Sequence, residues 1–136
     1  MHLVMFETGE HNRSGLLAEG QVLDLTKVDP VIPRTLQAII EAGPAGLDRV
    51  LSARDRWLDG RLRSVPVYPL DGVRLRPPLP SPSKIVAIGR NYADHAHETG
   101  DEIPDRPLIF AKFPTTVVGP GDDIFWDPAL TQQVDY

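Results

Sequence analysis

Short apolar and alternating runs open the chain. Leu3–Phe6, Ser14–Ala18 and Gln21–Leu25 each have the residue pattern of a short β-strand. Glu19-Gly20, between the second and third runs, is a pair typical of tight turns. The first 25 residues therefore predict three short strands, with a tight turn between the last two.

A helical period replaces this pattern after residue 34. Thr35 is placed to open one helix, which Gly43-Pro44 ends. A second helix is expected from about Ala45 to Leu58, because apolar residues again recur at helical spacing. The apolar faces consist of Leu36, Ile39 and Ile40 in the first helix and of Leu47, Val50, Leu51 and Leu58 in the second.

Proline then interrupts the pattern. The chain has 14 prolines, roughly twice the average frequency, and several of them fall in the stretch Arg76–Ser83. Because proline lacks a backbone donor and restricts the residue before it, this stretch can be neither a helix nor a central strand. We interpret it as an extended connector, residues 77–83, between a small N-terminal module, residues 1–76, and a second domain. A rigid crossing without a domain boundary is the alternative.

The second part of the chain predicts strands again. Its expected elements, in order, are a buried strand at Lys84–Ile88 ended by Gly89, a short helix from Tyr92 to about Glu98, a strand at Pro107–Phe113, a turn at Gly119–Asp122 and the start of a strand at Ile124–Trp126. Counted with the N-terminal module, this predicts an α+β fold that is mainly β.

Composition narrows the class of protein. With 41% hydrophobic and 24% charged residues, the chain has the composition of a folded protein, and no apolar run approaches the roughly 20 residues of a membrane span. The start of the chain lacks the pattern of a signal peptide. The absence of cysteine excludes disulfides and thiolate zinc sites and fits a reducing cytoplasm, where we expect the protein.

The charge is unevenly distributed. The net charge is -5, and the whole negative excess comes from residues 81–136. Binding to nucleic acid or to an anionic membrane is therefore not expected. The acidic half is either an ordinary solvated surface or a site that a cation must neutralise.

The segment Gly89–Glu98 concentrates the candidate chemistry. His95 and Glu98 are three residues apart, which places both side chains on one face of a helical turn. A carboxylate bonded to one imidazole nitrogen orients the ring, so that the other nitrogen can accept a proton from water. The alternative is a plain surface contact between the two residues. His97 would lie on the other side of such a helix and cannot share the site.

Other polar residues are weaker candidates. The planar fork of Arg90 could bind a substrate carboxylate or form a structural ion pair. Lys112 interrupts an apolar strand, so it either meets an anion in a cavity or, as we slightly prefer, lies on the polar side of a half-exposed strand. The acidic set at Asp122, Asp123 and Asp127 lies in a turn context where aspartate is common, which argues against a metal site there.

Taken together, these segments resemble a known family. Lys84–His95, the block from Pro104 to Pro114, Val118–Asp122 and the ending Val134-Asp135-Tyr136 resemble, in order and spacing, the opening of the catalytic domain of the fumarylacetoacetate hydrolase family. The close resemblance covers about residues 81–136. The first 80 residues are similar only in kind to the variable N-terminal module of many members.

The resemblance implies a fold and a chemistry. It implies a small N-terminal α/β module followed by the start of a mixed β-roll, with residues 84–136 as the beginning of that catalytic domain, and it implies a homodimer. The substrate would be a small anionic 2-oxo or 1,3-dicarbonyl acid, such as an acylpyruvate. The reaction would be hydrolysis of a C–C bond, with decarboxylation of an oxaloacetate-type substrate or isomerisation as alternatives.

Site residues carry over by position. His95 and Glu98 match the water-activating dyad of the family, and Arg90 with the adjacent Asn91 lies where a substrate contact is expected. Lys112 matches a recurrent lysine, to which we assign substrate binding.

The resemblance also implies a divalent cation, Mg²⁺ or alternatively Mn²⁺ or Ca²⁺, bound by carboxylates. Its Glu-x-Glu pair and a further Asp are expected beyond Tyr136, so that no metal ligand is predicted among these 136 residues. We therefore expect this sequence to be part of a longer polypeptide and inactive by itself. A complete chain that is a non-catalytic binding module is the alternative.

Overall fold

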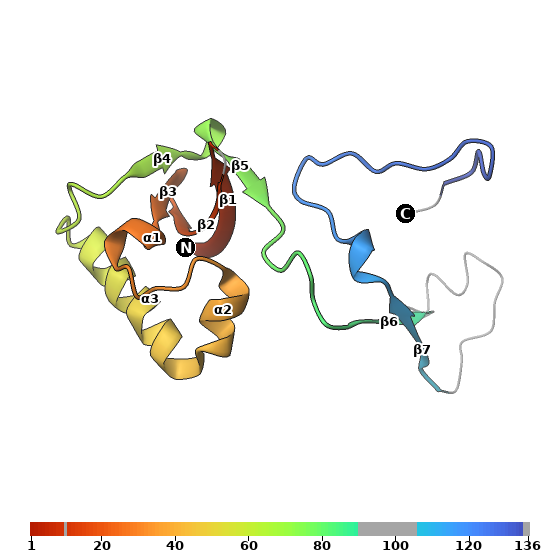
Figure 1. Cartoon of the computed structure of the whole chain (residues 1–136), viewed down its shortest axis with the longest axis horizontal. Coiled ribbons are helices and arrows are strands. Elements are labelled where there is room, and N and C mark those ends of the chain that lie inside the picture. Colours follow the sequence, from red (N-terminus) through yellow and green to blue (C-terminus); the bar gives the residue numbers. More distant parts are fainter. Residues whose placement is uncertain (10, 90–105, 135–136) are drawn as a thin grey trace. The chain divides into compact units, whose positions relative to one another are not determined.

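A computed structural model describes residues 1–9, 11–89 and 106–134. The chain packs into two units, one formed by residues 1–79 and 118–136 and the other by residues 80–117. Figure 1 shows the strands and helices of residues 1–76 gathered together. These units reflect packing within this chain alone, so the predicted boundaries at 77–83 remain a prediction. No helix in the described ranges is long and apolar enough to cross a membrane.

The first unit is built on a five-stranded antiparallel sheet. Its strands are β1 (His2–Thr8), β2 (His11–Ala18), β3 (Gln21–Asp24), β4 (Val67–Pro69) and β5 (Arg74–Arg76). Their order in the sheet is β4-β3-β2-β1-β5. The three strands predicted at the N-terminal end are thus confirmed, and β4 and β5 add one edge each.

The predicted turn between β2 and β3 is also confirmed. Glu19 and Gly20 have φ angles of 49° and 73°. Positive φ at both central residues is the requirement of a type I′ turn, whose twist matches that of the strands it joins. Gly20 meets this requirement without steric cost, which fixes the register in which Ala18 pairs with Gln21.

Three helices complete the first unit. They are α1 (Leu25–Val28), α2 (Leu36–Glu41) and α3 (Gly43–Leu58). The Thr35 side chain caps α2 by accepting from the amide of Ala38 at 3.2 Å, as its position predicted. The α1 helix was not predicted, and α3 begins two residues earlier than expected.

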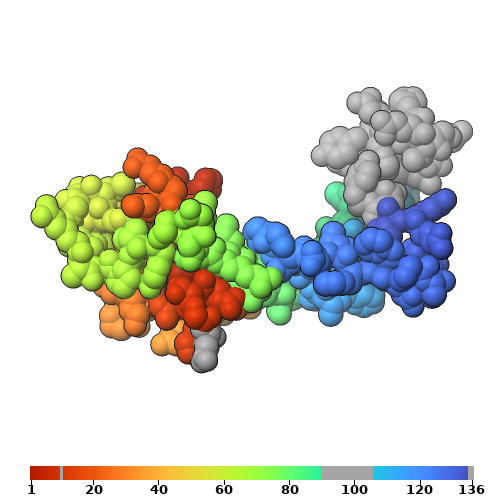
Figure 2. Space-filling view, turned by 90° about the horizontal axis from the view of Figure 1, so that it is seen from above, coloured from red at the N-terminus to blue at the C-terminus, as the bar shows by residue number. Residues whose placement is uncertain are grey.

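The helices cover one side of the sheet and enclose the core. The residues of this core come from β1–β3, the three helices and the loops between them: Met5, Leu16, Leu23, Leu25, Ile32, Leu36, Ile39, Val50, Ala53 and Leu62. In the space-filling view of one face, the strands and helices of this unit lie together as one body (Figure 2). Transfer of this apolar surface out of water is the main source of the unit's stability.

The predicted apolar face of α3 needs a correction. Val50 is buried as expected, but the helix buries Gly46 and Ala53 beside it. Leu47 and Leu58 are 47% and 66% exposed. The buried stripe is therefore rotated by about one residue. At Gly46 the helix lies close to α2, since an added Cβ would be 2.6 Å from the carbonyl oxygen of Ile39.

The described residues of the second unit contain one antiparallel strand pair. It consists of β6 (Ile85–Gly89) and β7 (Leu108–Lys112), both close to their predicted bounds. The described residues also include two short 3-10 helices, η1 (Leu70–Gly72) in the first unit and η2 (Pro114–Thr116), which follows β7 in the second. The strand expected to begin at Ile124–Trp126 is absent: these residues have no regular structure. Among the described residues no strand lies beside them to supply hydrogen bonds.

Candidate functional site

Most residues predicted for the site belong to the segment 90–105. His95, Glu98, Arg90 and Asn91 therefore lie outside the described residues. What the structure does describe are the two strands that this segment connects, since β6 ends at Gly89 and β7 begins at Leu108. The predicted dyad is thus carried by the connection of an antiparallel strand pair.

Lys112 is the predicted site residue that the structure describes. It pairs with Ile85, whereas Gly89, where the segment 90–105 departs, pairs with Leu108. Four steps of about 3.3 Å separate these two ends of the pair, or roughly 13 Å along the strands. Lys112 is exposed and lies at the end of the pair opposite to the attachment of the predicted dyad. Its role in substrate binding remains a prediction.

Both faces of this strand pair are apolar. Val86, Ile88 and Ile109 share one face and are 64%, 51% and 65% exposed, respectively. Leu108 and Phe110 on the other face are 53% and 43% exposed. Strands that are apolar on both sides are typical of sheets covered by further layers on both faces.

The carboxylates of Asp122 and Asp127 are engaged in hydrogen bonds within the chain. Asp122 accepts a hydrogen bond at each of its carboxylate oxygens, and Oδ1 of Asp127 accepts from the amide of Ala129 at 2.8 Å. Across the described ranges, no three His, Asp or Glu side chains are grouped closely enough to hold a metal ion. The residues described here therefore do not fit the divalent cation that the resemblance implies, and the expected location of its ligands beyond Tyr136 remains a prediction.

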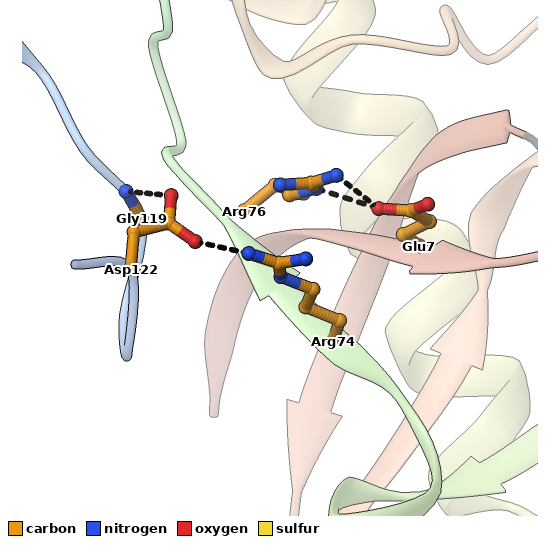
Figure 3. Close-up of polar contacts among 5 residues, drawn as sticks. All are labelled: Glu7, Arg74, Arg76, Gly119 and Asp122. Atoms are coloured by element: carbon orange, nitrogen blue, oxygen red, sulfur yellow. Dashed lines mark hydrogen bonds and ion pairs between the residues drawn. The ribbon is translucent and has the colours of Figure 1, made fainter.

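A polar arrangement outside the predicted site involves strand β5 and the turn at 119–122. Nη2 of Arg74 donates to Oδ1 of Asp122 at 2.6 Å, and the amide of Gly119 donates to Oδ2 at 2.8 Å (Figure 3). Arg74 and then the Gly119 amide hold the pKa of Asp122 below its ordinary value, and the bond to Asp122 raises the pKa of Arg74. Sequence reasoning predicted the turn but missed Arg74, because nothing local links residues 48 positions apart.

Comparison with known proteins decides the family. A model of the fumarylacetoacetate (FAA) hydrolase C-terminal region matches residues 84–136. The human mitochondrial oxaloacetate tautomerase FAHD2A is 36% identical over 135 residues, which cover 99% of this chain and 39% of that protein. The chain belongs to the fumarylacetoacetate hydrolase family. The oxaloacetate tautomerase YisK of Bacillus subtilis is 38% identical over 146 residues, or 96% of this chain and 48% of that relative.

Solved structures of the fumarylacetoacetate hydrolase family agree with the fold. Fumarylacetoacetate hydrolase from Exiguobacterium antarcticum matches 96% of this chain and 42% of its own length, with a TM-score of 0.65 and 28% identity. The maleylpyruvate hydrolase from Sphingobium sp. SYK-6, solved with manganese(II) and pyruvate, matches 95% of the chain and 44% of its own length, with a TM-score of 0.57 and 23% identity. The predicted α+β, mainly β fold is confirmed.

The chain is much shorter than the relatives named above. It spans between 39% and 48% of the length of these four proteins. The activity, substrates and partners of the complete protein are therefore proposed below.

Proposed function

We propose that this chain is part of an enzyme that transfers protons on a small anionic 2-oxo acid, with keto–enol tautomerisation of oxaloacetate as the first candidate. The observation that carries the proposal is its relation to named oxaloacetate tautomerases, 36% identical in human and 38% identical in Bacillus subtilis across nearly the whole chain. This kinship extends over the N-terminal unit and over the segment that carries the predicted dyad.

His95 and Glu98 supply the chemistry in this proposal. In tautomerisation a base removes the proton from the carbon beside the keto group, and a proton is delivered to the keto oxygen. A histidine oriented by a carboxylate can serve as this base near neutral pH. Arg90, Asn91 and Lys112 bind the substrate carboxylates, because guanidinium, amide and ammonium groups all donate to them.

A divalent cation, Mg²⁺ or alternatively Mn²⁺ or Ca²⁺, belongs to the proposal and would polarise the keto group. Manganese(II) in the maleylpyruvate hydrolase structure supports it. From the family resemblance, we assign cation binding to carboxylates expected beyond Tyr136, and the chain by itself is expected to be inactive.

Hydrolysis of a C–C bond is the second candidate, supported by the similarity to fumarylacetoacetate hydrolase from Exiguobacterium antarcticum. In this reaction His95, oriented by Glu98, takes a proton from the water that attacks a carbonyl of an acylpyruvate. Decarboxylation of oxaloacetate is the further alternative within the family.

A homodimer is part of the proposal. The cytoplasmic location remains a prediction, which the mitochondrial names of several relatives challenge.

Rate measurements on the complete gene product test the proposal. The enol form of oxaloacetate is followed by ultraviolet absorbance, and pyruvate release from acylpyruvates and from oxaloacetate is measured in parallel. His95→Ala is expected to slow tautomerisation by about 10²–10⁴-fold, the usual contribution of a general base. The matched control is His97→Ala, which should leave the rate within about twofold, because the predicted helical spacing puts position 97 on the other side of the turn from position 95.

The outcomes separate the candidates. Acylpyruvate cleavage without accelerated tautomerisation would favour the hydrolase, and pyruvate release from oxaloacetate would favour the decarboxylase. Equal effects of the two histidine variants would exclude His95 as the base. A complete protein without any of these activities would contradict the assignment as an enzyme of 2-oxo acids.

A further inference from the structure

The chain returns to the first unit at the strand from which it departs. Residues 1–79 and 118–136 belong to that unit, and residues 80–117 lie between them in the sequence. Strand β5 (Arg74–Arg76) precedes the departure, and the turn at 119–122 follows the return. The hydrogen bond between Arg74 and Asp122 joins these two points across 48 positions of the sequence.

A close steric fit accompanies this bond. Gly119 is buried, and a Cβ atom added to it would lie 3.0 Å from Cδ of Pro77 and 3.4 Å from the carbonyl oxygen of Leu75. The same Cβ would lie 3.0 Å from Oδ2 of Asp122, which accepts from the Gly119 amide. A larger residue at this position would require these neighbours to shift by a few tenths of an ångström. The return of the chain is therefore fixed by shape as well as by charge.

A second ion pair anchors strand β5 to β1. Arg76 donates from Nε to Oε2 of Glu7 at 2.7 Å, and Glu7 lies on β1, where it pairs in register with Arg74. Arg74 and Arg76 are two positions apart and so share one face of the strand (Figure 3). One arginine ties β5 to the sheet, and the other ties the returning chain to β5.

The Arg74–Asp122 pair is poorly suited to stabilising the core. The Arg74 side chain is 59% exposed, and exposed ion pairs contribute little to folding. The pair instead closes the loop of chain between residues 74 and 122. Closing a loop restricts the separation of its two ends. All residues predicted for the catalytic and substrate-binding site, Arg90, Asn91, His95, Glu98 and Lys112, belong to this loop.

We propose that Arg74 and Asp122 are positioning residues, which hold the returning chain at Gly119 against β5 and so fix both ends of the segment that carries the predicted dyad. The proposal rests on the function proposed above, because it assigns catalysis to that segment. It gives the contact between β5 and the turn at 119–122 a role beyond the folding of the first unit.

The first experiment measures the closure itself, by amide hydrogen exchange in the complete gene product. Asp122→Asn removes the charge but keeps the size of the side chain, and Gly119→Ala disturbs the fit without removing a charge. Exchange at residues 74–76 and 118–122 is expected to rise about two- to fivefold in Asp122→Asn, the range for losing an exposed ion pair, and by more in Gly119→Ala.

Arg54→Gln is the matched control for this measurement. Arg54 forms an exposed ion pair at 2.8 Å with its neighbour Asp55, so the variant loses a similar pair that closes no loop. Its exchange at residues 74–76 and 118–122 should match that of the wild type. Unchanged exchange in both Asp122→Asn and Gly119→Ala would show that these contacts do not close the loop, which overturns the proposal.

The second experiment measures catalysis by the same variants and by a charge exchange. Asp122→Asn and Arg74→Gln are expected to lower kcat about three- to tenfold with KM within about twofold, because small displacements of catalytic groups reduce turnover steeply. The double variant Arg74→Asp with Asp122→Arg restores the ion pair in reverse but leaves the Gly119 amide without its acceptor and places a carboxylate opposite Glu7, so it should recover kcat only in part. A purely structural role would lower the amount of active enzyme without changing kcat per active site.

The two proposals fail in different ways. Faster exchange with unchanged kcat per active site would overturn the positioning role and leave the proposed function intact. A wild-type protein inactive on all 2-oxo acids tested would overturn the proposed function, and the exchange data would then decide only whether Arg74 and Asp122 close the loop.

Discussion

Asp24 is fully buried at the end of β3 although it carries a carboxylate. Its Oδ2 accepts from Nη1 of Arg13 at 2.8 Å, and its Oδ1 accepts from the amide of Thr26 at 2.9 Å and from the Thr26 hydroxyl. The bond to Asp24 raises the pKa of Arg13. Asp24 thus caps helix α1 and neutralises an arginine of β2. We predict that Asp24→Ala strongly destabilises the first unit.

The magnitude follows from the bonds that are lost. Removing a helix cap costs about 0.5–2 kcal/mol, and removing one partner of a buried ion pair costs about 3–5 kcal/mol. The two losses overlap, because one carboxylate serves both. The Arg13 side chain is 23% exposed and also lies near Tyr68, so it is partly stabilised without Asp24. We therefore expect a loss of about 3 kcal/mol, the lower end of the ion-pair range.

Urea denaturation of the chain, followed by circular dichroism and by the fluorescence of Trp57 beside the core, measures this loss. With a slope of about 1.5 kcal/mol per molar urea, the midpoint should fall by about 2 M. Asp24→Asn keeps an oxygen for the Thr26 amide and should fall by roughly half as much. Asp59→Ala, which breaks the exposed pair with Arg61, is the control and should stay within about 0.3 M. An Asp24→Asn midpoint as close to wild type as that of the control would refute the reasoning.

Two further predictions concern the turn at 119–122 and the core. Arg74 and the Gly119 amide lower the pKa of Asp122, and the charge of Arg76 lowers it further. The carboxylates of Glu7 and Asp123 lie near Arg74 and help to raise its pKa. Because the pKa is lower when folded, the contact should persist at neutral pH and be lost as the pH falls below the ordinary carboxyl range, near ~3.9. The amide chemical shift of Gly119 reports this loss, and a shift constant down to the acidic limit would contradict it. Leu23→Ala should cost about 2–5 kcal/mol by urea denaturation, since Leu23 is fully buried; a cost below 1 kcal/mol would show that the core closes around the cavity.

Local pattern accounts for the elements that the sequence predicted. Strands β1–β3 follow from short apolar runs and from Glu19-Gly20, and α2 follows from the capping residue Thr35. The α1 helix was missed, although Asp24 followed by Thr26 is the same kind of capping signal. Four residues are too few for the periodicity of a helix to be visible.

Strands β4 and β5 could not be found from local pattern. Each has three residues, and each is formed by pairing with a distant strand, Leu23 with Val67 and Phe6 with Leu75. The proline-rich stretch that starts at Arg76 was predicted to exclude a central strand, and β5, which ends at Arg76, lies at an edge of the sheet. For the site, the sequence identified the strands β6 and β7 and the position of Lys112, whereas the dyad that it proposes lies outside the described residues.

The strand expected at Ile124–Trp126 does not form for the same reason that the faces of β6 and β7 are exposed: no described neighbour covers these residues. Ile124 and Phe125 are 70% and 87% exposed, and Val86 and Ile109 are 64% and 65% exposed. The N-terminal unit, in contrast, leaves no buried side-chain polar atom of its described residues without a hydrogen bond. A strand forms where a neighbour satisfies its backbone and covers its apolar side chains. The sequence encodes such partners for residues 1–79, and the apolar residues of 84–130 have the pattern of strands that need partners from further layers.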